Sequence, residues 1–305
     1  MYVLKTMVHE TIWGGNRLTA LSGTDNKSIG HLYSVFDVDG KANTVQSSDK
    51  YNGKSLHDLF EGKKKEWGLD WFKEFPLVIA LVDATDDLSI QVHPDDEMAN
   101  KLLQRPFGKN ESFYFIEAPT SGKTYDGCNC NSSDELKKAI DNGKIGEAVG
   151  TVDIKKGDYV YIQAGTLHAA AKGSLIFEIE ENSEVTYRFY DFDRIDKDGK
   201  KRPLQLDKAL MCLDTNKQSS PEPMKQDGDN WYMHRMYSVK HFVNDSVYTN
   251  DTQTVACATL MAGEATLSGG IKVTPGTAVL LEPNETIDFG NCEFMVTVPQ
   301  YGFRL

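Results

Sequence analysis

Short apolar or alternating segments recur along most of this chain, and they constrain its fold more than any other feature. Each is bounded by glycine, asparagine or aspartate residues of the kind found in tight turns. The segments with this pattern are residues 77–83, 112–118, 159–164, 174–180 and 185–191. Fewer segments have a helical start signal or a 3.6-residue spacing, namely residues 55–68, 94–104, 132–143 and 203–213. The pattern predicts a mainly β protein, a sandwich or barrel with a helical insertion.

Composition excludes some partners. The chain has 305 residues and a net charge of −12, which argues against binding to duplex nucleic acid but not against an anionic small molecule. We find no apolar run long enough to cross a bilayer and no secretory signal, so we expect no membrane partner. The five cysteines are an odd number without framework spacing, and the Cys128–Cys130 pair is a weak metal signal. We therefore expect reduced thiols and a cytoplasmic protein.

A possible internal repeat would indicate that the chain contains two related β-domains. Residues 155–168 align without gaps on residues 274–287, with Gly157 opposite Gly276 and His168 opposite Ile287. A turn glycine followed by an alternating strand also arises by chance, so the repeat leaves one or two β-domains open. A polar segment without periodicity at 215–230 suggests a boundary. We expect a domain of residues 1–218, with helical insertions at about 132–150 and 203–213, and a C-terminal domain of residues 219–305 without metal ligands.

The segment Leu88–Asp96, LSIQVHPDD, combines a strand pattern with an unusual polar face. Side chains two apart on a strand point to the same side, so Ser89, Gln91 and His93 can face one cavity. Pro94 ends the strand, and the acids that follow suit the first turn of a helix. The PDDE stretch therefore has a structural explanation that needs no chemistry.

Two further residues extend this polar set. His168 begins a strand after the turn at Gly165, and Glu111 stands at the head of another strand. Two histidines and a carboxylate suit a divalent metal such as Zn²⁺ with an open position for substrate. A single strand histidine is more often a structural group, and spacing alone does not show that these strands converge.

Charged residues on two other segments are candidates for binding or catalysis. Arg188 lies between two aromatic residues on a half-buried strand, and Arg194 follows it. Both arginines have the alternative of surface pairing with nearby aspartates. Glu178 and Glu180 share one strand face, where one of them could act as a general base or both could be exposed carboxylates.

With these residues identified, the chain resembles a type I mannose-6-phosphate isomerase of the short bacterial form. The resemblance runs in order through residues 10–15, 88–99, 108–116, 164–169 and 185–194, and LSIQVHPDD is its most specific block. It implies two cupin-type jelly-roll domains with a helical insertion. This agrees with the repeat and the helices predicted above.

The resemblance also implies a site. One zinc ion per chain would be held by Gln91, His93, Glu111 and His168, and the partner would be a small-molecule sugar phosphate. The implied reaction interconverts mannose 6-phosphate and fructose 6-phosphate through a cis-enediol. The catalytic candidates are Arg188 as an electrostatic clamp, Glu178 as the base and Lys109 as its competitor, and the candidates for phosphate binding are Ser89 and Arg194.

Four positions depart from the family pattern. His31 stands where a glutamate is usual, Tyr33 where a tryptophan is usual, Ala80 where a lysine is usual, and Gln163 where a proline is usual. If the usual glutamate and lysine pair with each other, their joint replacement leaves no unpaired charge. If they contact the sugar, the alternatives are a relative that acts on another sugar phosphate, or a non-catalytic sugar-binding or regulatory protein.

Overall fold

The middle layer of this computed structural model is a seven-stranded antiparallel sheet, called here the central sheet. The residues that the structure describes are 1–183, 185–196, 198–225, 230–243 and 247–300. Within them, the central sheet has the strand order β16 (Glu222–Pro223), β12 (Asp158–Ile162), β9 (Glu111–Glu117), β14 (Leu175–Glu181), β7 (Leu77–Asp83), β3 (Ile29–Val35) and β2 (Met7–Gly15). The middle strands are buried along their length because both faces of this sheet are covered.

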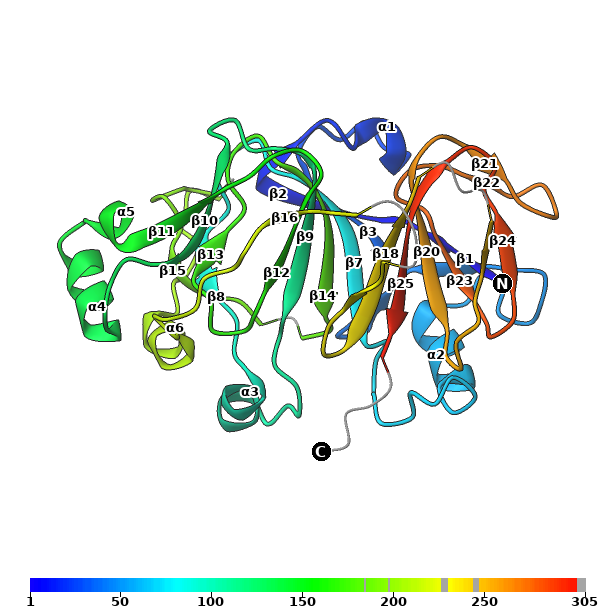
Figure 1. Ribbon diagram of the computed structural model, residues 1–305, viewed down its shortest axis with the longest axis horizontal. Coiled ribbons are helices and arrows are strands. Elements are labelled where there is room, and N and C mark those ends of the chain that lie inside the picture. Colours follow the sequence, from blue (N-terminus) through cyan, green and yellow to red (C-terminus); the bar gives the residue numbers. More distant parts are fainter. Residues whose placement is uncertain (184, 197, 226–229, 244–246, 301–305) are drawn as a thin grey trace.

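A second sheet, called the outer sheet, covers one face of the central sheet. Its strands are β11 (Val149–Asp153), β10 (Lys123–Cys128), β13 (His168–Ala169), β8 (Ile90–Val92) and β15 (Tyr187–Tyr190). Apolar side chains from both sheets form one core, including Phe113 and Phe115 from the central sheet and Val92 and Phe189 from the outer sheet. The two sheets together form the first jelly roll, at the left of Figure 1.

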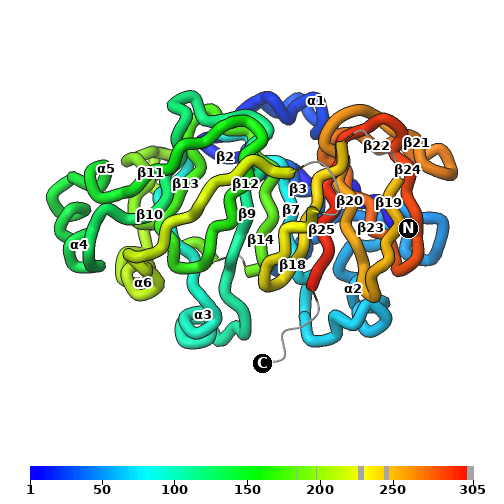
Figure 2. The backbone as a smooth tube through the Cα atoms, in the orientation of Figure 1, coloured from blue at the N-terminus to red at the C-terminus, as the bar shows by residue number. Residues whose placement is uncertain are grey.

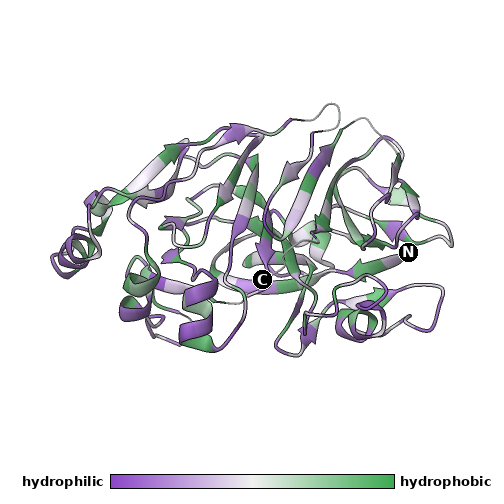
Figure 3. Ribbon diagram, turned by 60° about the horizontal axis from the view of Figure 1, so that its bottom comes forward, coloured by the Kyte–Doolittle hydropathy of each residue, from purple (hydrophilic) through white to green (hydrophobic). Residues whose placement is uncertain are grey.

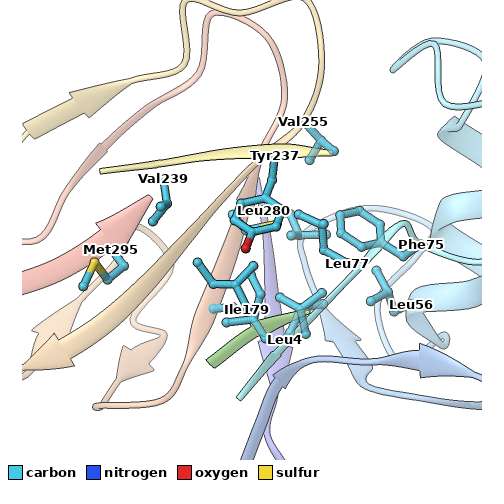
Figure 4. Packing of buried hydrophobic residues seen from close by; sticks show 14 of the residues in the cluster. Leu4, Leu56, Phe75, Leu77, Ile179, Tyr237, Val239, Val255, Leu280 and Met295 are labelled. Atoms are coloured by element: carbon cyan, nitrogen blue, oxygen red, sulfur yellow. The ribbon is translucent and has the colours of Figure 1, made fainter. Parts of the chain in front are cut away.

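A third sheet, the C-terminal sheet, covers the opposite face. Its strands are β17 (Tyr232–Met233), β18 (Tyr237–Phe242), β25 (Glu293–Pro299), β20 (Ala256–Ala262), β23 (Ala278–Leu281), β1 (Tyr2–Lys5) and β6 (Thr44–Gln46). Figure 4 shows Ile179 of the central sheet packed with Tyr237, Leu280 and Leu4 of this sheet. This shared apolar layer joins the two jelly rolls back to back.

Short strand pairs complete the second jelly roll. They are β19 (Val247–Thr249) with β24 (Thr286–Asp288) and β21 (Ala265–Thr266) with β22 (Lys272–Val273). Between them and the C-terminal sheet lies a separate apolar core. A hairpin of β4 (Asp37–Val38) and β5 (Lys41–Ala42) lies outside these sheets. The predicted fold class, two jelly rolls of mainly β structure, is confirmed.

Strands cross the expected domain boundary in both directions. β1 and β6, from the N-terminal part of the chain, pair in the C-terminal sheet, and Figure 2 shows this blue segment among orange and red strands. Beyond residue 218, β16 pairs with β12 in the central sheet. The division into domains of residues 1–218 and 219–305 therefore stays a proposal. In it, β1 and β6 of the first domain pair in the C-terminal sheet, and β16 of the second domain pairs in the central sheet.

The four predicted helical segments all contain helices. The described helices are α1 (Thr19–Ser22), α2 (Leu56–Lys63), α3 (Asp96–Leu103), α4 (Ser133–Asp141), α5 (Ile145–Ala148) and α6 (Leu206–Cys212). Figure 3 shows hydrophilic, purple faces on these helices and hydrophobic, green stretches along the strands. No helix among the described residues is long and apolar enough to cross a membrane.

One detail of the predicted helix start is wrong. Pro94 does not enter the first turn of α3, because Asp95 is the N-cap and its side chain accepts a hydrogen bond from the backbone N–H of Met98. An aspartate cap satisfies an amide that would otherwise lack a partner, which is why the helix begins one residue beyond Asp95. Pro94 instead ends the extended segment that carries His93.

The aligned segments of the sequence repeat have matching local structure. Gly157 and Gly276 both have φ of 86°, a left-handed conformation that favours glycine, and each leads into a strand, β12 or β23. Ile287, which aligns with His168, is buried in the apolar core of the second jelly roll. The matching turn and strand agree with two related jelly rolls.

Candidate metal centre

A row of polar side chains crosses the outer sheet. Asp126 on β10 is the register partner of His168 on β13, His168 is the partner of Gln91 on β8, and Gln91 is the partner of Arg188 on β15. Register partners in antiparallel strands project to the same side of the sheet. Gln91, His168 and Arg188 therefore face the interior of the first jelly roll together, although 97 positions separate the first from the last.

Glu111 meets this row from the central sheet. One of its oxygens, Oε1, lies 2.9 Å from His168 Nε2, and the other, Oε2, lies 3.1 Å from His93 Nε2. All three side chains are 1% exposed, and their ligand atoms lie within 4.8 Å of one another. The predicted convergence of His93, Glu111 and His168 is thus a feature of the structure, with both sheets contributing.

The hydrogen bonds of these residues leave ligand atoms free to face one point. His93 Nδ1 lies 2.6 Å from the carbonyl oxygen of Val185, and His168 Nδ1 lies 2.9 Å from that of Thr166. A carbonyl can only accept, so each Nδ1 carries a proton, and in the neutral ring Nε2 presents a lone pair. His93 Nε2 and both Glu111 oxygens are buried without a hydrogen-bond partner among the described residues. These orphaned atoms fit a bound cation.

Gln91 completes the set at the open side of these three residues. Its Nε2 lies 3.4 Å from His168 Nε2, and its Oε1 accepts a hydrogen bond from Ser89 Oγ at 3.1 Å. Turning the amide by 180° occupies the same space and presents the oxygen beside His168, with Ser89 then accepting from the amide nitrogen. Two imidazoles, a carboxylate and an amide oxygen form a donor set suited to zinc.

Charge inside the cavity favours the forms that bind a metal. Burial, reinforced by the Lys109 charge, lowers the pKa of His93 to about 4, so this imidazole is neutral at pH 7. Burial alone would raise the pKa of Glu111, but His93, Lys109 and His168 hold it well below its usual range. Burial alone would lower the pKa of His168, but the charge of Glu111 and its hydrogen bond favour the protonated imidazole, so the pKa is raised. A metal at this site would displace that proton.

An acid–base cluster lies beside the ligand set. Lys109 Nζ is 2.9 Å from Glu180 Oε1 and 3.4 Å from Glu111 Oε2. Glu178 is the register neighbour of Phe113 on β9, two residues beyond Glu111, and its buried Oε2 has no hydrogen-bond partner among the described residues. Burial, then the neighbouring Glu180 and Glu111, raise the pKa of Glu178 well above its usual value. The predicted catalytic candidates Glu178 and Lys109 therefore lie beside Glu111.

The two predicted arginines differ in what they offer. Arg188 Nε is buried without a hydrogen-bond partner among the described residues, and burial followed by the charge of Arg202 lowers its pKa. Arg194 is held by Asp191 and by the carbonyl of Asp87, with its Nε donating to the Asp191 carbonyl at 3.1 Å. Arg194 is thus held by neighbouring groups, while Arg188 Nε has no hydrogen-bond partner among the described residues.

Sequence reasoning assigned no site role to Arg202 or Asp126, and it identified His31 only as a departure from the family pattern. Arg202 donates to Asp191 from Nε at 2.7 Å, so two guanidinium groups surround one carboxylate and leave a net positive charge. His31 lies with its Nε2 3.8 Å from Glu178 Oε2. Asp126 stands next to His168 in the polar row. The pair of glutamates on one strand face did point to Glu180, but nothing in the local pattern distinguishes Arg202 or Asp126 from surface residues.

The fold and these contacts define a cupin protein with a buried candidate metal centre. A family model for the phosphomannose isomerase type I catalytic domain matches residues 1–114. Over 278 residues the chain is 32% identical to mannose-6-phosphate isomerase ManA of Bacillus subtilis strain 168, which covers 91% of this chain and 82% of that protein. By this relationship, the chain belongs to the mannose-6-phosphate isomerase family of enzymes.

Solved structures agree in fold. The crystal structure of the mannose 6-phosphate isomerase from Bacillus subtilis has a TM-score of 0.81 and 27% identity, covering 97% of this chain and 99% of that chain. A crystal structure of a mannose 6-phosphate isomerase bound with zinc and yttrium has a TM-score of 0.71 and 14% identity, covering 99% and 100%. The second likeness is one of fold alone.

Proposed function

We propose that this chain is a zinc-dependent aldose–ketose isomerase that interconverts mannose 6-phosphate and fructose 6-phosphate through a cis-enediol. One observation carries the proposal: the buried set of His93, Glu111 and His168 lies directly beside the Glu178 and Lys109 side chains. Ligands for a Lewis acid and groups that can move a proton therefore share one cavity. Membership of the isomerase family supports the choice of substrates.

Gln91, His93, Glu111 and His168 would hold one zinc ion per chain. Zinc held by these residues would supply Lewis-acid polarisation of the sugar oxygens. The related structure bound with zinc and yttrium supports zinc as the metal. The carbonyls of Val185 and Thr166 keep the two imidazoles in the orientation that a metal needs.

Proton transfer between C2 and C1 requires a base that reaches both carbons. Glu178 is our candidate, because its Oε2 is buried, lacks a partner among the described residues and lies next to the ligand set. Lys109 is the competitor, but its Nζ is held by Glu180 and Glu111. Those two ion pairs favour Lys109 as a fixed positive charge and Glu178 as the group that takes and returns the proton.

Positive charge is needed where the enediolate oxygen becomes negative. Arg188 projects into the cavity beside Gln91, and its Nε–H has no other acceptor among the described residues. A fixed donor in a buried site stabilises developing charge without rearranging, which supports Arg188 as the electrostatic clamp.

The phosphate group would lie on the Ser89 and Arg194 side of the cavity. Ser89 is buried beside Gln91, and the Arg194–Asp191–Arg202 cluster carries a net positive charge. We propose that Ser89 contacts the phosphate and that Arg194 attracts it mainly through charge, since each of its three nitrogens already donates one hydrogen bond to Asp191 or Asp87.

Turnover of another sugar phosphate is the second candidate. It is favoured by the wall of the cavity next to Glu178, where His31, Tyr33 and Ala80 depart from the family pattern. A non-catalytic sugar-phosphate sensor would keep the same residues without turnover. The partner in each case is a small-molecule sugar phosphate. A cytoplasmic location and the absence of nucleic-acid and membrane partners remain predictions.

A coupled assay with metal analysis on the same sample tests the proposal. The purified protein is assayed with mannose 6-phosphate, fructose 6-phosphate and other hexose phosphates, before and after chelation and after zinc is restored. We expect turnover of mannose 6-phosphate that chelation abolishes and zinc restores. Absence of turnover by zinc-loaded protein would refute the isomerase, and tight binding without conversion would favour a sensor. Turnover that survives complete metal removal would refute the zinc mechanism.

A further inference from the structure

His31 is a histidine on the same side of the central sheet as Glu178. Across three neighbouring strands, Tyr33 on β3 is the register partner of Ala80 on β7, and Ala80 is the partner of Glu178 on β14. His31 lies two residues before Tyr33 on β3, where its register partner is Val82. His31, Tyr33 and Glu178 therefore project from the same face of the central sheet, the face that carries Glu111.

Aromatic contacts fix the orientation of the His31 ring. It stacks on Tyr33 with centroids 5.3 Å apart and an angle of 6° between the planes. Trp13 approaches it edge-on at 5.1 Å, and His9 lies at 5.6 Å. Rings packed on several sides have few alternative rotamers, so the imidazole points one edge at a defined place.

That place is the carboxyl group of Glu178. His31 Nε2 lies 3.8 Å from Glu178 Oε2, an oxygen that is buried and has no hydrogen-bond partner among the described residues. His31 Nδ1 is buried and likewise lacks a partner in the described part of the chain. A separation of 3.8 Å is longer than a hydrogen bond, but catalytic contacts of this kind commonly shorten when a substrate binds.

The imidazole is suited to hold a group that gains and loses a proton. Burial, with smaller contributions from His9 and Lys109, lowers the pKa of His31 to about 3. The ring is therefore neutral at pH 7, and a neutral imidazole can donate to a carboxylate or accept from a carboxylic acid. A permanently charged group at this position would favour one protonation state of Glu178 over the other.

Ala80 makes this contact geometrically possible. It is fully buried on β7, the strand between His31 and Glu178, and it stands between Tyr33 and Glu178 in the register. A long side chain at residue 80 would project into the space between Tyr33 and Glu178. The small side chain of Ala80 thus leaves the space that the contact between His31 and Glu178 needs.

We propose that His31 is a positioning residue that holds the Glu178 carboxyl group toward the sugar carbons by a hydrogen bond from its Nε2 edge. This inference rests on the proposed function, in which Glu178 moves the proton. His31 itself contacts neither the sugar nor the metal ligands in this proposal. Its contribution is to limit the rotation of the Glu178 side chain when the proton is transferred.

Kinetics of two variants test the role. His31→Leu removes both ring nitrogens, and His31→Gln restores a group that can donate or accept near the position of Nε2. We expect kcat for mannose 6-phosphate to fall at least about 10-fold in His31→Leu, part of the 10²–10⁴ that a general base supplies, and to recover largely in His31→Gln. KM and zinc content should stay close to those of the unaltered protein in both.

A matched control separates this role from a general effect of losing a histidine. His57 also pairs with a carboxylate, since its Nδ1 lies 3.1 Å from Asp37 Oδ1, but it lies on α2 outside the cavity. His57→Gln should leave kcat unchanged. Equal losses of kcat in His31→Leu and His31→Gln, or loss of zinc in both, would overturn the positioning role and indicate packing alone.

A second measurement does not depend on turnover. In zinc-loaded protein, the ¹⁵N resonances of the His31 ring are compared with those of the Glu178→Gln variant, and His31→Gln identifies the signals. A change at Nε2 larger than at Nδ1 supports the contact, and unchanged ring signals overturn it. If the unaltered protein does not isomerise mannose 6-phosphate, the proposed function fails, while this measurement still decides whether His31 holds Glu178.

Discussion

Gln91 and His168 are register partners on neighbouring antiparallel strands, and their Nε2 atoms lie 3.4 Å apart. The outer sheet thus aligns two candidate ligands by backbone pairing, and the central sheet supplies Glu111 opposite them. A site built from two sheets of one jelly roll is rigid, because ladder hydrogen bonds and the apolar core hold each ligand's backbone. Metal affinity and catalysis should therefore respond to different substitutions.

Glu111→Gln should weaken metal binding strongly. The substitution keeps the shape of the side chain but removes the one anionic donor in the set of Gln91, His93, Glu111 and His168. Removing a group that contacts the metal should lower the affinity by more than the roughly 10–100-fold typical of removing a hydrogen-bond partner of a ligand. Competition with a chelator of known affinity measures it. Glu117→Gln, at the exposed end of the same strand, is the control and should keep its zinc.

Arg188→Ala should lower kcat by about 10²–10³-fold, the loss typical of removing one fixed donor to a developing negative charge. Zinc content should not change, because Arg188 is a neighbour of Gln91 and not a member of the ligand set. Steady-state kinetics and metal analysis on one preparation measure both. Arg105→Ala, which removes a surface arginine paired with Asp39, should have neither effect. Loss of zinc from Arg188→Ala would show that its assigned role is wrong.

Tyr237→Phe should destabilise the protein without emptying the metal centre. The Tyr237 hydroxyl, from the C-terminal sheet, bonds the Ser112 hydroxyl on β9, next to Glu111. Loss of this buried hydrogen bond should lower the free energy of unfolding by about 0.5–1.5 kcal/mol. Denaturant unfolding measures the change. A large fall in zinc affinity would instead show that the second jelly roll tunes the site through Ser112.

Acid should destabilise the protein in part through His234. Burial lowers the pKa of this imidazole to about 4, and its ring stacks on Tyr161 with centroids 3.9 Å apart. Between about pH 6.5 and pH 4 the unfolded chain binds a proton that the folded chain excludes, so stability falls as the pH falls through this range. His234→Gln should flatten that part of the curve of unfolding free energy against pH. An unchanged slope would contradict the assignment.

Local features of the fold were predictable because they depend on neighbours in the chain. Residues 77–83 form β7 with the predicted bounds, since a short apolar run between turn signals can be buried on both faces of a sheet. The capping box at Ser55 begins α2, and Gly157 makes the turn before β12. The prediction placed Pro94 in the first turn of α3, but it lies two residues before the first helical residue because Asp95 caps the helix.

The candidate ligands were predictable as residue types, but residue spacing alone did not show that they meet. Alternation on one strand relates Gln91 to its immediate neighbours, and the family resemblance suggested that Glu111 and His168 join them. The network around the site has no such signal. His31 on β3 reaches Glu178 on β14 across the intervening strand β7, and Arg202 reaches Asp191 from a loop.

By itself, the sequence determined the strand periods, the helix caps, the turn glycines and the kinds of donor available for a metal. Only the tertiary structure decided that β1 and β6 pair with C-terminal strands, that Gln91 lies between His168 and Arg188, and that Ala80 lies beside Glu178. The physical reason is that backbone hydrogen bonds can join any two strands. Which strands pair, and in which register, depends on burying the apolar faces of all three layers at once.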